Sequence, residues 1–465
     1  MIGEIQMRPT YHSDSLRTSA AKHLWMHNRD WSTMPNQNNP IIVVDGNGVK
    51  VTDSDGISWI DVNGGYNSVN VGYGRTEISQ AADAQMSQLA YFPQGTTTIP
   101  TIQLAEKIAE ITPGSLNRVF PVSGGSEANE TALKIARAYH KRRGEHGRYK
   151  IISRKGSYHG GTGGVYWLGG VPLQNRQDYE PAYPGMLYAP QPNPYRCELG
   201  GKSSAECATL CSQAVEDLII FHGPESIAAF IAEPISQPQG AVIPGDEYWP
   251  AIREICDKYG ILLIDDEVIC GFGRTGKMFG IQHWDVIPDI MTVGKGIISS
   301  YLPLGATIVR DEIANYFMGE DKFFRHVFTF SGHPVPSAAA LKNIEILENE
   351  NLVIRSAETG AYFKTRLEEL MEIHPIIGDV RGIGMLLALE LVADRKTKNK
   401  FSPNLKIPVR LNEKFQNHNL LLRISSDIIT LGPPLCVSKD EVNEIIEALN
   451  SSLAELEKEL GLLRT

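Results

Sequence analysis

A short apolar run that ends in three consecutive carboxylates constrains this chain more than any other feature. Residues 261–264 (ILLI) are typical of a buried parallel strand, and Asp265, Asp266 and Glu267 follow directly. The carboxyl ends of strands in an open α/β sheet face the ligand crevice. Because side chains alternate along a strand, Asp266 is expected to face away from its two acidic neighbours. The pattern predicts an α/β protein with a site at this strand end.

A single lysine follows the next apolar run. Lys295 stands between two glycines after residues 291–293 (MTV). A lysine desolvated in this way has a lowered pKa and becomes a usable nucleophile. Together with Asp266 it suggests a pyridoxal phosphate site, because the cofactor's aldehyde needs a lysine and its ring nitrogen needs a carboxylate. The alternative is a turn acid and a solvated lysine, since structural charges also occur at strand ends.

The longer stretch resembles the class III (omega) aminotransferases, which are pyridoxal phosphate enzymes of fold type I. Their signature is similar to LLIxDEVxxGFGRTGxxF, then a proline–aspartate pair and the Schiff-base lysine. Residues 262–279, residues 288–289 and Lys295 match it in that order. The resemblance implies that Lys295 carries the cofactor, that Asp266 keeps the ring nitrogen protonated and that Val268 packs on one ring face.

Further motifs of the same family extend the expected cofactor site. Gly125 and Ser126 lie in GSEAN, where a glycine turn opens a helix whose amides and dipole attract an anion. The resemblance makes them phosphate ligands and makes Tyr158 the aromatic residue stacked on the cofactor ring. His159, beside it, is interpreted as structural. Thr329, in a TFSGHP loop, is expected to reach the phosphate of a neighbouring subunit, which implies a homodimer with shared active sites and leaves a tetramer open.

The same resemblance indicates substrate-binding residues. Trp25 lies in an arm that reaches toward the site entrance in this family, although packing of an N-terminal helix would also explain it. Tyr66 stands where many relatives carry tryptophan. Arg423 corresponds to the arginine that grips the carboxylate of a keto acid, since guanidinium binds carboxylates in a bidentate way; a surface ion pair is the alternative. Residues 237–239 (QPQ) replace a glycine-rich run, with an effect that the sequence leaves open.

The expected reaction moves an amino group from an amine or ω-amino acid to a keto acid by a ping-pong mechanism. Ile269 favours the amine–pyruvate branch, because the ornithine and GABA branches usually carry glutamine there. The donor, its stereochemistry and the choice between pyruvate and 2-oxoglutarate stay open. An epimerase or decarboxylase of the same fold is an alternative, because such enzymes share Asp266 and Lys295.

A second, more remote alternative is a nicotinamide-dependent oxidoreductase. GFGRTG (residues 271–276) has the GxGxxG spacing of a dinucleotide fingerprint. A fingerprint of that kind opens directly into an amphipathic helix, and residues 277–280 carry no helical pattern. The spacing alone therefore gives little support for nicotinamide binding.

Composition narrows the partners and the compartment. The chain has 465 residues, 42% hydrophobic and 21% charged, as is ordinary for a globular enzyme, and its formal net charge of −10 disfavours nucleic acid as a partner. No apolar run reaches the roughly 20 residues that span a membrane, and the first residues lack a secretory h-region. Six scattered cysteines favour reduced thiols and a cytoplasmic location. Cys197, Cys207 and Cys211 invite a zinc site, but no histidine lies close by, so no metal is predicted.

The expected architecture has two domains. Residues 75–335 are predicted to form the large cofactor-binding domain around a mainly parallel sheet, and residues 1–74 and 336–465 a small α+β domain. A three-strand meander with turns at residues 45–46 and 55–56 opens the chain. Residues 170–205, rich in Pro, Gly and Asn, are interpreted as a long surface loop. A capping box from Ser438 to Glu441 predicts the start of the C-terminal helix.

Overall fold

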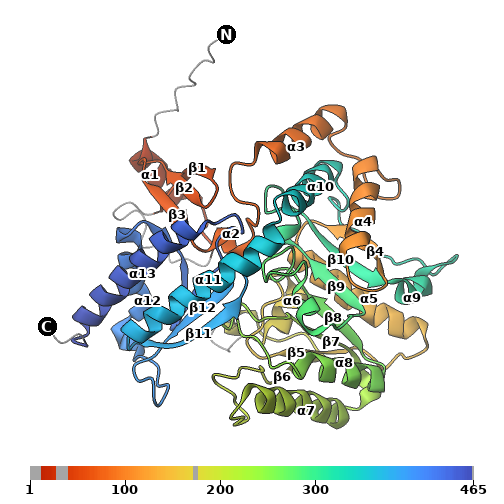
Figure 1. Ribbon diagram of the computed structural model, residues 1–465. Helices are drawn as coiled ribbons and strands as arrows, with labels where there is room; N and C mark the ends of the chain where they lie inside the picture. The colour runs from red at the N-terminus through yellow and green to blue at the C-terminus, as the bar shows by residue number, and fades with distance from the viewer. Residues whose placement is uncertain (1–11, 28–39, 171–175, 463–465) are drawn as a thin grey trace.

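A seven-stranded sheet forms the centre of the protein in the computed structural model, which describes residues 12–27, 40–170 and 176–462 (Figure 1). Its order is β4-β10-β9-β8-β7-β5-β6. β10 is antiparallel to both of its neighbours, and the other pairings are parallel. The strands span Leu116–Val122 (β4), Lys150–Arg154 (β5), Met186–Ala189 (β6), Ile227–Ala232 (β7), Leu262–Asp266 (β8), Ile290–Val293 (β9) and Gly305–Arg310 (β10). The expected α/β class with a mainly parallel sheet is confirmed.

The central strands form because they are apolar on both faces. Every residue of β7, β8 and β9 is buried, as expected where helices cover both sides of a parallel sheet. The covering and flanking helices are α3 (Thr76–Gln88), α4 (Ile99–Ile111), α5 (Gly125–Arg142), α6 (Gly163–Tyr166), α7 (Ser204–His222), α8 (Tyr248–Tyr259), α9 (Asp311–Ala314) and α10 (Pro334–Asn349).

The interpretation of residues 170–205 as one surface loop was wrong in part. β6 lies within this segment and pairs in parallel with β5, from Ile151 opposite Met186 to Arg154 opposite Ala189. The strand has only four residues (MLYA). Turn-forming residues flank so short a strand closely, and an edge strand carries a weak sequence signal.

Two further sheets lie beside the central one (Figure 1). The first has the order β1-β2-β3-β13, and the parallel pairing of β3 with β13 joins the two ends of the chain. The second has the order β11-β12-β15-β14. Their strands are Val43–Asn47 (β1), Lys50–Asp53 (β2), Ser58–Asp61 (β3), Ile377–Ile383 (β11), Leu386–Leu391 (β12), Leu420–Leu421 (β13), Arg423–Ser425 (β14) and Ile428–Leu431 (β15).

The first turn of the N-terminal meander is displaced from its expected place. β1 continues through Asp45 and Gly46 to Asn47, and the chain turns at Gly48, whose φ is +59°. Gly46 is needed in the strand, since a Cβ there would lie 2.9 Å from Cβ of Tyr73. The Asp-Gly pair therefore marks a close approach between segments and not the turn itself.

Helices of both chain ends complete this part of the molecule. They are α1 (Ser13–His23), α2 (Gly64–Asn67), α11 (Leu352–Ile373), α12 (Ile407–Asn417) and α13 (Lys439–Glu459). The predicted capping box is confirmed, with the amide of Glu441 donating to Ser438 Oγ at 3.2 Å and the amide of Ser438 donating to the Glu441 carboxylate at 2.8 Å. Within the described residues, none of the helices combines the length and apolar character needed to cross a lipid bilayer.

Candidate active site

The carboxyl ends of five strands meet at one edge of the central sheet. β4, β9, β8, β7 and β5 run in the same direction, since only β10 is reversed. The residues at these ends are the start of α5, residues 155–162, Glu233, residues 266–268 and Lys295. Most of the residues predicted to bind the cofactor are therefore delivered to the same edge by the sheet topology.

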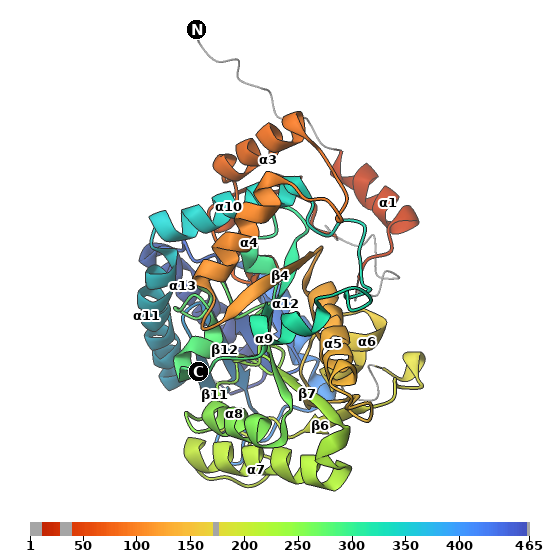
Figure 2. The same cartoon turned by 90° about the vertical axis from the view of Figure 1, so that its right-hand side faces the viewer.

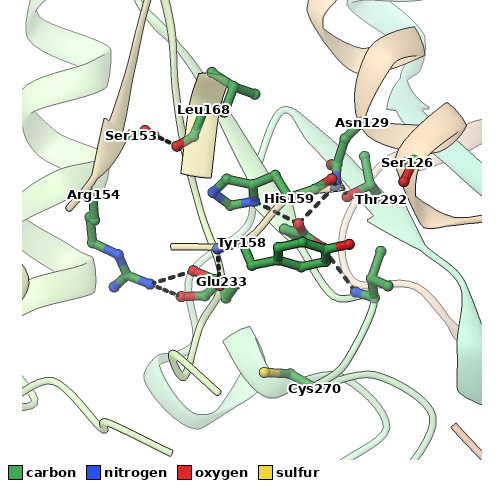
Figure 3. Close-up of polar contacts among 12 residues, drawn as sticks. Ser126, Asn129, Ser153, Arg154, Tyr158, His159, Leu168, Glu233, Cys270 and Thr292 are labelled. Carbon is green, nitrogen blue, oxygen red and sulfur yellow. Dashed lines mark hydrogen bonds and ion pairs between the residues drawn. The ribbon is translucent and has the colours of Figure 1, made fainter. Parts of the chain in front are cut away.

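Asp266 is held in place by three donors at the end of β8. Asn129 Nδ2 lies 2.8 Å and His159 Nδ1 2.7 Å from Oδ2 of this carboxylate, and the amide of Val268 donates to Oδ1 at 3.1 Å. Thr292 Oγ1 donates to Asn129 Oδ1 at 2.7 Å, which turns the Asn129 amino group toward the carboxylate (Figure 3). Asp266 is thus an oriented anion on a rigid strand.

The two neighbouring acids face the other way, as alternation along the strand predicts. Glu267 accepts hydrogen bonds from the amides of Gly280 and Ile281, at 2.9 and 2.8 Å. Burial raises the pKa of Glu267 to about 7. Burial and the nearby Glu267 raise the pKa of Asp265 well above its usual value. The two acids therefore belong to the interior, on the side of β8 opposite to Asp266.

His159 is the main electrostatic partner of Asp266. Burial lowers the pKa of His159, but the hydrogen bond to Asp266 and the negative charges of Glu233 and Asp266 outweigh it, so that the pKa is raised. Glu233 itself is paired with Arg154 at 3.3 Å and accepts a hydrogen bond from the amide of Tyr158 at 3.2 Å (Figure 3). This chain of charges fixes the loop that carries both Tyr158 and His159.

Lys295 follows β9 in a strained conformation. It opens the short 3-10 helix Lys295–Ile297 with a φ of +46°, a region that residues other than glycine rarely adopt. Burial lowers the pKa of Lys295 to about 8, Asp266 opposes the shift, and the positive charges of Arg423 and Arg274 add to it. A lysine of lowered pKa loses its proton more readily than an ordinary lysine, and the uncharged form is what a nucleophilic amine requires.

Three residues with little or no side chain make a narrow gap beside this lysine. A Cβ on Gly125 would lie 2.7 Å from Cγ1 of Val268, and a Cβ on Gly294 would lie 3.2 Å from the amide nitrogen of Gly125. Ser126 Oγ accepts a hydrogen bond from the amide of Gly161 at 3.1 Å. The predicted phosphate-binding residues are thus in contact with Val268 and with the loop that follows Tyr158. Tyr158 itself is 52% exposed.

The predicted substrate residues occupy two places. The guanidinium carbon of Arg423, at the start of β14, lies 5.8 Å from the ring centroid of Tyr66, and the charge of Arg423 acts on Lys295. Trp25 follows α1 and is 76% exposed. Helix α1 packs on the N-terminal sheet, where Ser13 Oγ lies 2.9 Å from Ser54 Oγ. Arg423 and Tyr66 are therefore neighbours, whereas the role of Trp25 stays a prediction.

Thr329 is exposed on the loop before α10. Its carbonyl accepts a hydrogen bond from Tyr91 at 2.7 Å, and the same loop is joined to the start of α4 by a hydrogen bond of 2.9 Å from Thr101 Oγ1 to the carbonyl of Gly332. Phe330, its neighbour, is 62% exposed. Thr329 thus lies at the surface of the chain, as a contact to a second subunit would require.

Two functional features were missed or left open by the sequence. Asn129 was not singled out, although its place three residues after Ser126 puts it one helical turn further along α5, above Asp266.

The GFGRTG motif serves packing: the buried Arg274 donates to Asn70 Oδ1 at 2.6 Å and to the carbonyl of Met385 at 3.2 Å. A Cβ on Gly276 would lie 2.8 Å from Cβ of Ala357 in α11. The motif therefore joins the central sheet to the C-terminal part of the chain.

These residues fit a pyridoxal phosphate group. The N-terminus of α5 offers amides without helical partners for a phosphate, and a Cβ on Gly124 would meet no atom within 4 Å, so the turn is open. Asp266 supplies an oriented carboxylate for a ring nitrogen. Lys295 supplies an amine of lowered pKa for an aldehyde. The donor set is that of the expected cofactor.

Comparison with known proteins agrees with this geometry. A family model described as Aminotransferase class-III matches residues 32–453. A putrescine–pyruvate aminotransferase from Pseudomonas aeruginosa is 40% identical over 414 residues, which cover 88% of this chain and 90% of that protein. A crystal structure of an (S)-enantioselective omega-transaminase from Thermomicrobium roseum has a TM-score of 0.93 and 40% identity, covering 96% of this chain and all of that one. An amine transaminase from an uncultivated Pseudomonas species, solved in its PLP-bound form, has a TM-score of 0.89 and 35% identity over 93% of this chain and 98% of that one.

Proposed function

Because the chain belongs to the class-III aminotransferase family and is therefore an enzyme that transfers amino groups, we propose that it moves the amino group of a primary amine or ω-amino acid to pyruvate. The family implies pyridoxal phosphate as the cofactor. When bound, this group supplies the electron sink that makes the carbon–hydrogen bond beside the amine acidic. The observation that carries the proposal is the pairing of an amine of lowered pKa, Lys295, with the oriented carboxylate Asp266.

The roles of the protein groups follow from their surroundings. Asp266 keeps a ring nitrogen protonated, and Asn129 and His159 hold that carboxylate in position. Lys295, whose pKa is lowered to about 8, would serve as both base and acid near neutral pH and would move the proton at the reacting carbon. Gly125 and Ser126 would bind the phosphate, Val268 would pack against one face of the ring, and Tyr158 would stack on the ring.

Arg423 is proposed to bind the carboxylate of the keto acid. It is exposed, and its guanidinium carbon lies 5.8 Å from the ring centroid of Tyr66. The cation–π contact gives the side chain a resting place when an uncharged amine substituent occupies the site. Pyruvate as the acceptor is supported by the pyruvate-dependent relative, and Ile269 supports the same branch.

A homodimer with shared active sites is part of the proposal. The exposed apolar residues Met86, near the end of helix α3, and Leu89, directly after it, support a subunit interface together with Ile99, Val327 and Phe330. Such an interface would bring Thr329 to the partner's phosphate site. We also propose that residues 75–335 form the large domain and that residues 1–74 and 336–465 form the small one, as the pairing of β3 with β13 supports. Six free thiols support a cytoplasmic location.

The visible absorption spectrum of the purified holoenzyme tests the proposal. We expect a cofactor band that bleaches with one of a panel of amines and returns with pyruvate, while alanine forms in an amount equal to the cofactor present. A matched variant, Arg423→Ala, should raise the KM for pyruvate about tenfold or more and leave bleaching by an uncharged-tail amine nearly unchanged.

The alternatives have distinct outcomes in the same experiment. A band that responds to amines while no alanine forms from pyruvate would instead indicate an epimerase or decarboxylase of this fold. If Arg423→Ala is no longer bleached by amines but still reacts with pyruvate, the assignment of this arginine to the acceptor would be contradicted. A nicotinamide-dependent reaction finds no support in the packing role of Arg274.

A further inference from the structure

Three of the six cysteines converge at a place that the proposed reaction does not use. The sulfur atoms of Cys197, Cys207 and Cys211 all lie within 4.8 Å of one another, and this is the one such group of potential metal ligands among the described residues. Cys207 and Cys211 lie one turn apart on α7, and Cys197 lies in the loop between β6 and α7. The sequence singles out these three cysteines but predicts no metal for want of a nearby histidine, and it does not show that Cys197 lies against the two cysteines of α7.

We propose that Cys197, Cys207 and Cys211 bind one zinc ion, which fastens the loop of residues 190–203 to helix α7. Thiolate sulfur is a preferred ligand of Zn²⁺, and a tetrahedral site with zinc–sulfur bonds of about 2.3 Å places its sulfurs about 3.8 Å apart. To reach that geometry the three sulfurs, which now lie within 4.8 Å of one another, would have to draw slightly closer, as side-chain rotation allows. The two cysteines of α7 are four positions apart in the sequence. This spacing puts both sulfurs on one face of the helix.

The loop is built closely around these sulfurs. A Cβ on Gly201 would lie 2.8 Å from the Cα of Cys207 and 3.1 Å from the sulfur of Cys197, so that only glycine allows the loop to pass there. Cys207 and Cys211 are completely buried, whereas Cys197 is partly accessible. The cluster is therefore enclosed on the helix side and can be reached by an ion from the loop side.

The backbone of Gln191 lies next to the cluster. The sulfur of Cys211 is 3.7 Å from the carbonyl oxygen of Gln191. Both polar atoms of the Gln191 side chain are buried and have no hydrogen-bond partner, and this residue is only 9% exposed. A buried amide without partners is costly, so the Gln191 side chain favours an ordered water or another bound group as its partner. With three sulfur ligands, a zinc ion would take a water or another such donor as its fourth ligand.

The position of the loop indicates what the ion would do. Arg196, directly before Cys197, forms an ion pair with Glu390 in β12, and Glu390 also pairs with Arg381 at 2.8 Å. Lys398 donates to the carbonyl of Tyr195 at 2.7 Å. The loop thus joins α7 in the central part of the molecule to the sheet of β11 and β12. An ion at the three sulfurs would hold one end of this connection rigid.

Metal content and unfolding of the full-length holoenzyme test the proposal. Protein purified without chelator, or reloaded with Zn²⁺ and passed through a desalting column, should retain about one zinc per chain, and removal of the ion should lower the unfolding midpoint by about 3 °C or more. Replacement with Co²⁺ should give the intense bands of a tetrahedral thiolate site. Cys197→Ser and Cys211→Ser should lose both the bound zinc and the cobalt bands. Cys436→Ser, which changes a partly buried thiol outside the cluster, should keep both.

Two results would overturn the proposal. One is retention of less than about one-fifth of an equivalent of zinc, with no cobalt–thiolate bands, in a protein whose three thiols titrate as free. The other is a mass lower by two hydrogens together with a cross-linked peptide that joins two of these three cysteines, which would show that they have formed a disulfide. Cys197→Ser is the first variant to examine, because its partly accessible side chain carries less risk to folding than the buried Cys211.

Discussion

At the scale of single residues, the site depends on how one carboxylate is held. Asp266 receives hydrogen bonds from Asn129, His159 and the amide of Val268, and the orientation of Asn129 is set in turn by Thr292. A carboxylate fixed by several donors does not need to reorganise when charge develops nearby. The supporting residues should therefore affect turnover without touching the substrate.

Asn129→Ala tests this support. Loss of one hydrogen bond to a buried carboxylate costs about 1.5–3 kcal/mol, so we expect kcat to fall between about tenfold and a hundredfold, with KM for the amine little changed. Thr292→Val, which removes only the bond that orients Asn129, should show a smaller loss in the same direction. Steady-state kinetics with one amine and pyruvate measure both. If both variants instead raised the KM for the amine by the same factor, Asn129 would act on substrate binding.

The lowered pKa of Lys295 gives a pH-dependent prediction. Only the uncharged amine attacks an aldehyde, and the pKa is about 8. The rate at which apoprotein regains its cofactor band should therefore rise about tenfold per pH unit below about pH 8 and level off above it. The pKa of Lys295 in the folded protein lies below its value in the unfolded chain. The folding stability of the apoprotein should therefore also rise with pH, from about pH 8 up to the ordinary pKa of lysine. Lys295→Met is the control that removes both dependences, and a rate that keeps rising to pH 10 would contradict the lowered pKa.

At the scale of elements, the site is made by loops that leave parallel strands at one sheet edge. Helix α5 begins at Gly125 immediately after β4 and presents its N-terminal amides to that edge. β8 and β9 are adjacent, so Asp266 lies opposite Thr292 in the ladder and Lys295 follows three residues later. The contact of Gly125 with Val268 links these elements closely.

Gly125→Ala tests how closely α5 approaches β8. The new Cβ would lie 2.7 Å from Cγ1 of Val268, whose β-branched side chain has little rotational freedom to yield. We expect cofactor affinity to fall by about tenfold or more, which is about 1.4 kcal/mol. Gly147→Ala, in the loop between α5 and β5, is the control, because a Cβ there would meet only the carbonyl oxygen of Glu225, at 3.4 Å. Cofactor titration of the two apoproteins gives the answer, and equal affinities would argue against a close contact at the site.

At the scale of the whole molecule, apolar side chains remain exposed on one side. Helices α3 and α4 and the loop before α10 carry Met86, Ile99, Ile102, Val327 and Phe330, all more than half exposed. Figure 2 shows α3, α4 and α10 grouped at one end, away from α7 at the other. Exposed apolar side chains grouped on neighbouring elements are typical of an interface.

Phe330→Asp should dissociate the proposed dimer. A charge in the centre of an apolar interface costs several kcal/mol, so we expect the apparent mass in solution to fall toward that of one 51.3 kDa chain and activity to fall with it. Phe221→Asp replaces a phenylalanine that is 83% exposed at the end of α7 and should change neither property. Light scattering during size-exclusion chromatography measures the mass. A Phe330→Asp protein that stays dimeric would place the interface elsewhere.

Local pattern was enough to predict much of the fold and the centre of the site. The apolar runs of β7, β8 and β9 predict buried strands because both of their faces are covered. Alternation along β8 predicts which of three acids faces the site, and the capping box predicts the start of α13. These features follow from neighbouring residues alone, so the sequence carries them.

Tertiary structure decided what depends on contacts between distant segments. β6 is a strand only because β5 offers it an edge, and Asn129 reaches Asp266 only because α5 packs against β8 and β9. The Gly46 and Gly276 positions are explained by close approaches to Tyr73 and Ala357, and not by turns or nucleotide binding. The three sulfurs of Cys197, Cys207 and Cys211 meet because a loop folds back on α7. Proximity of this kind is a property of the packed chain, and no local pattern encodes it.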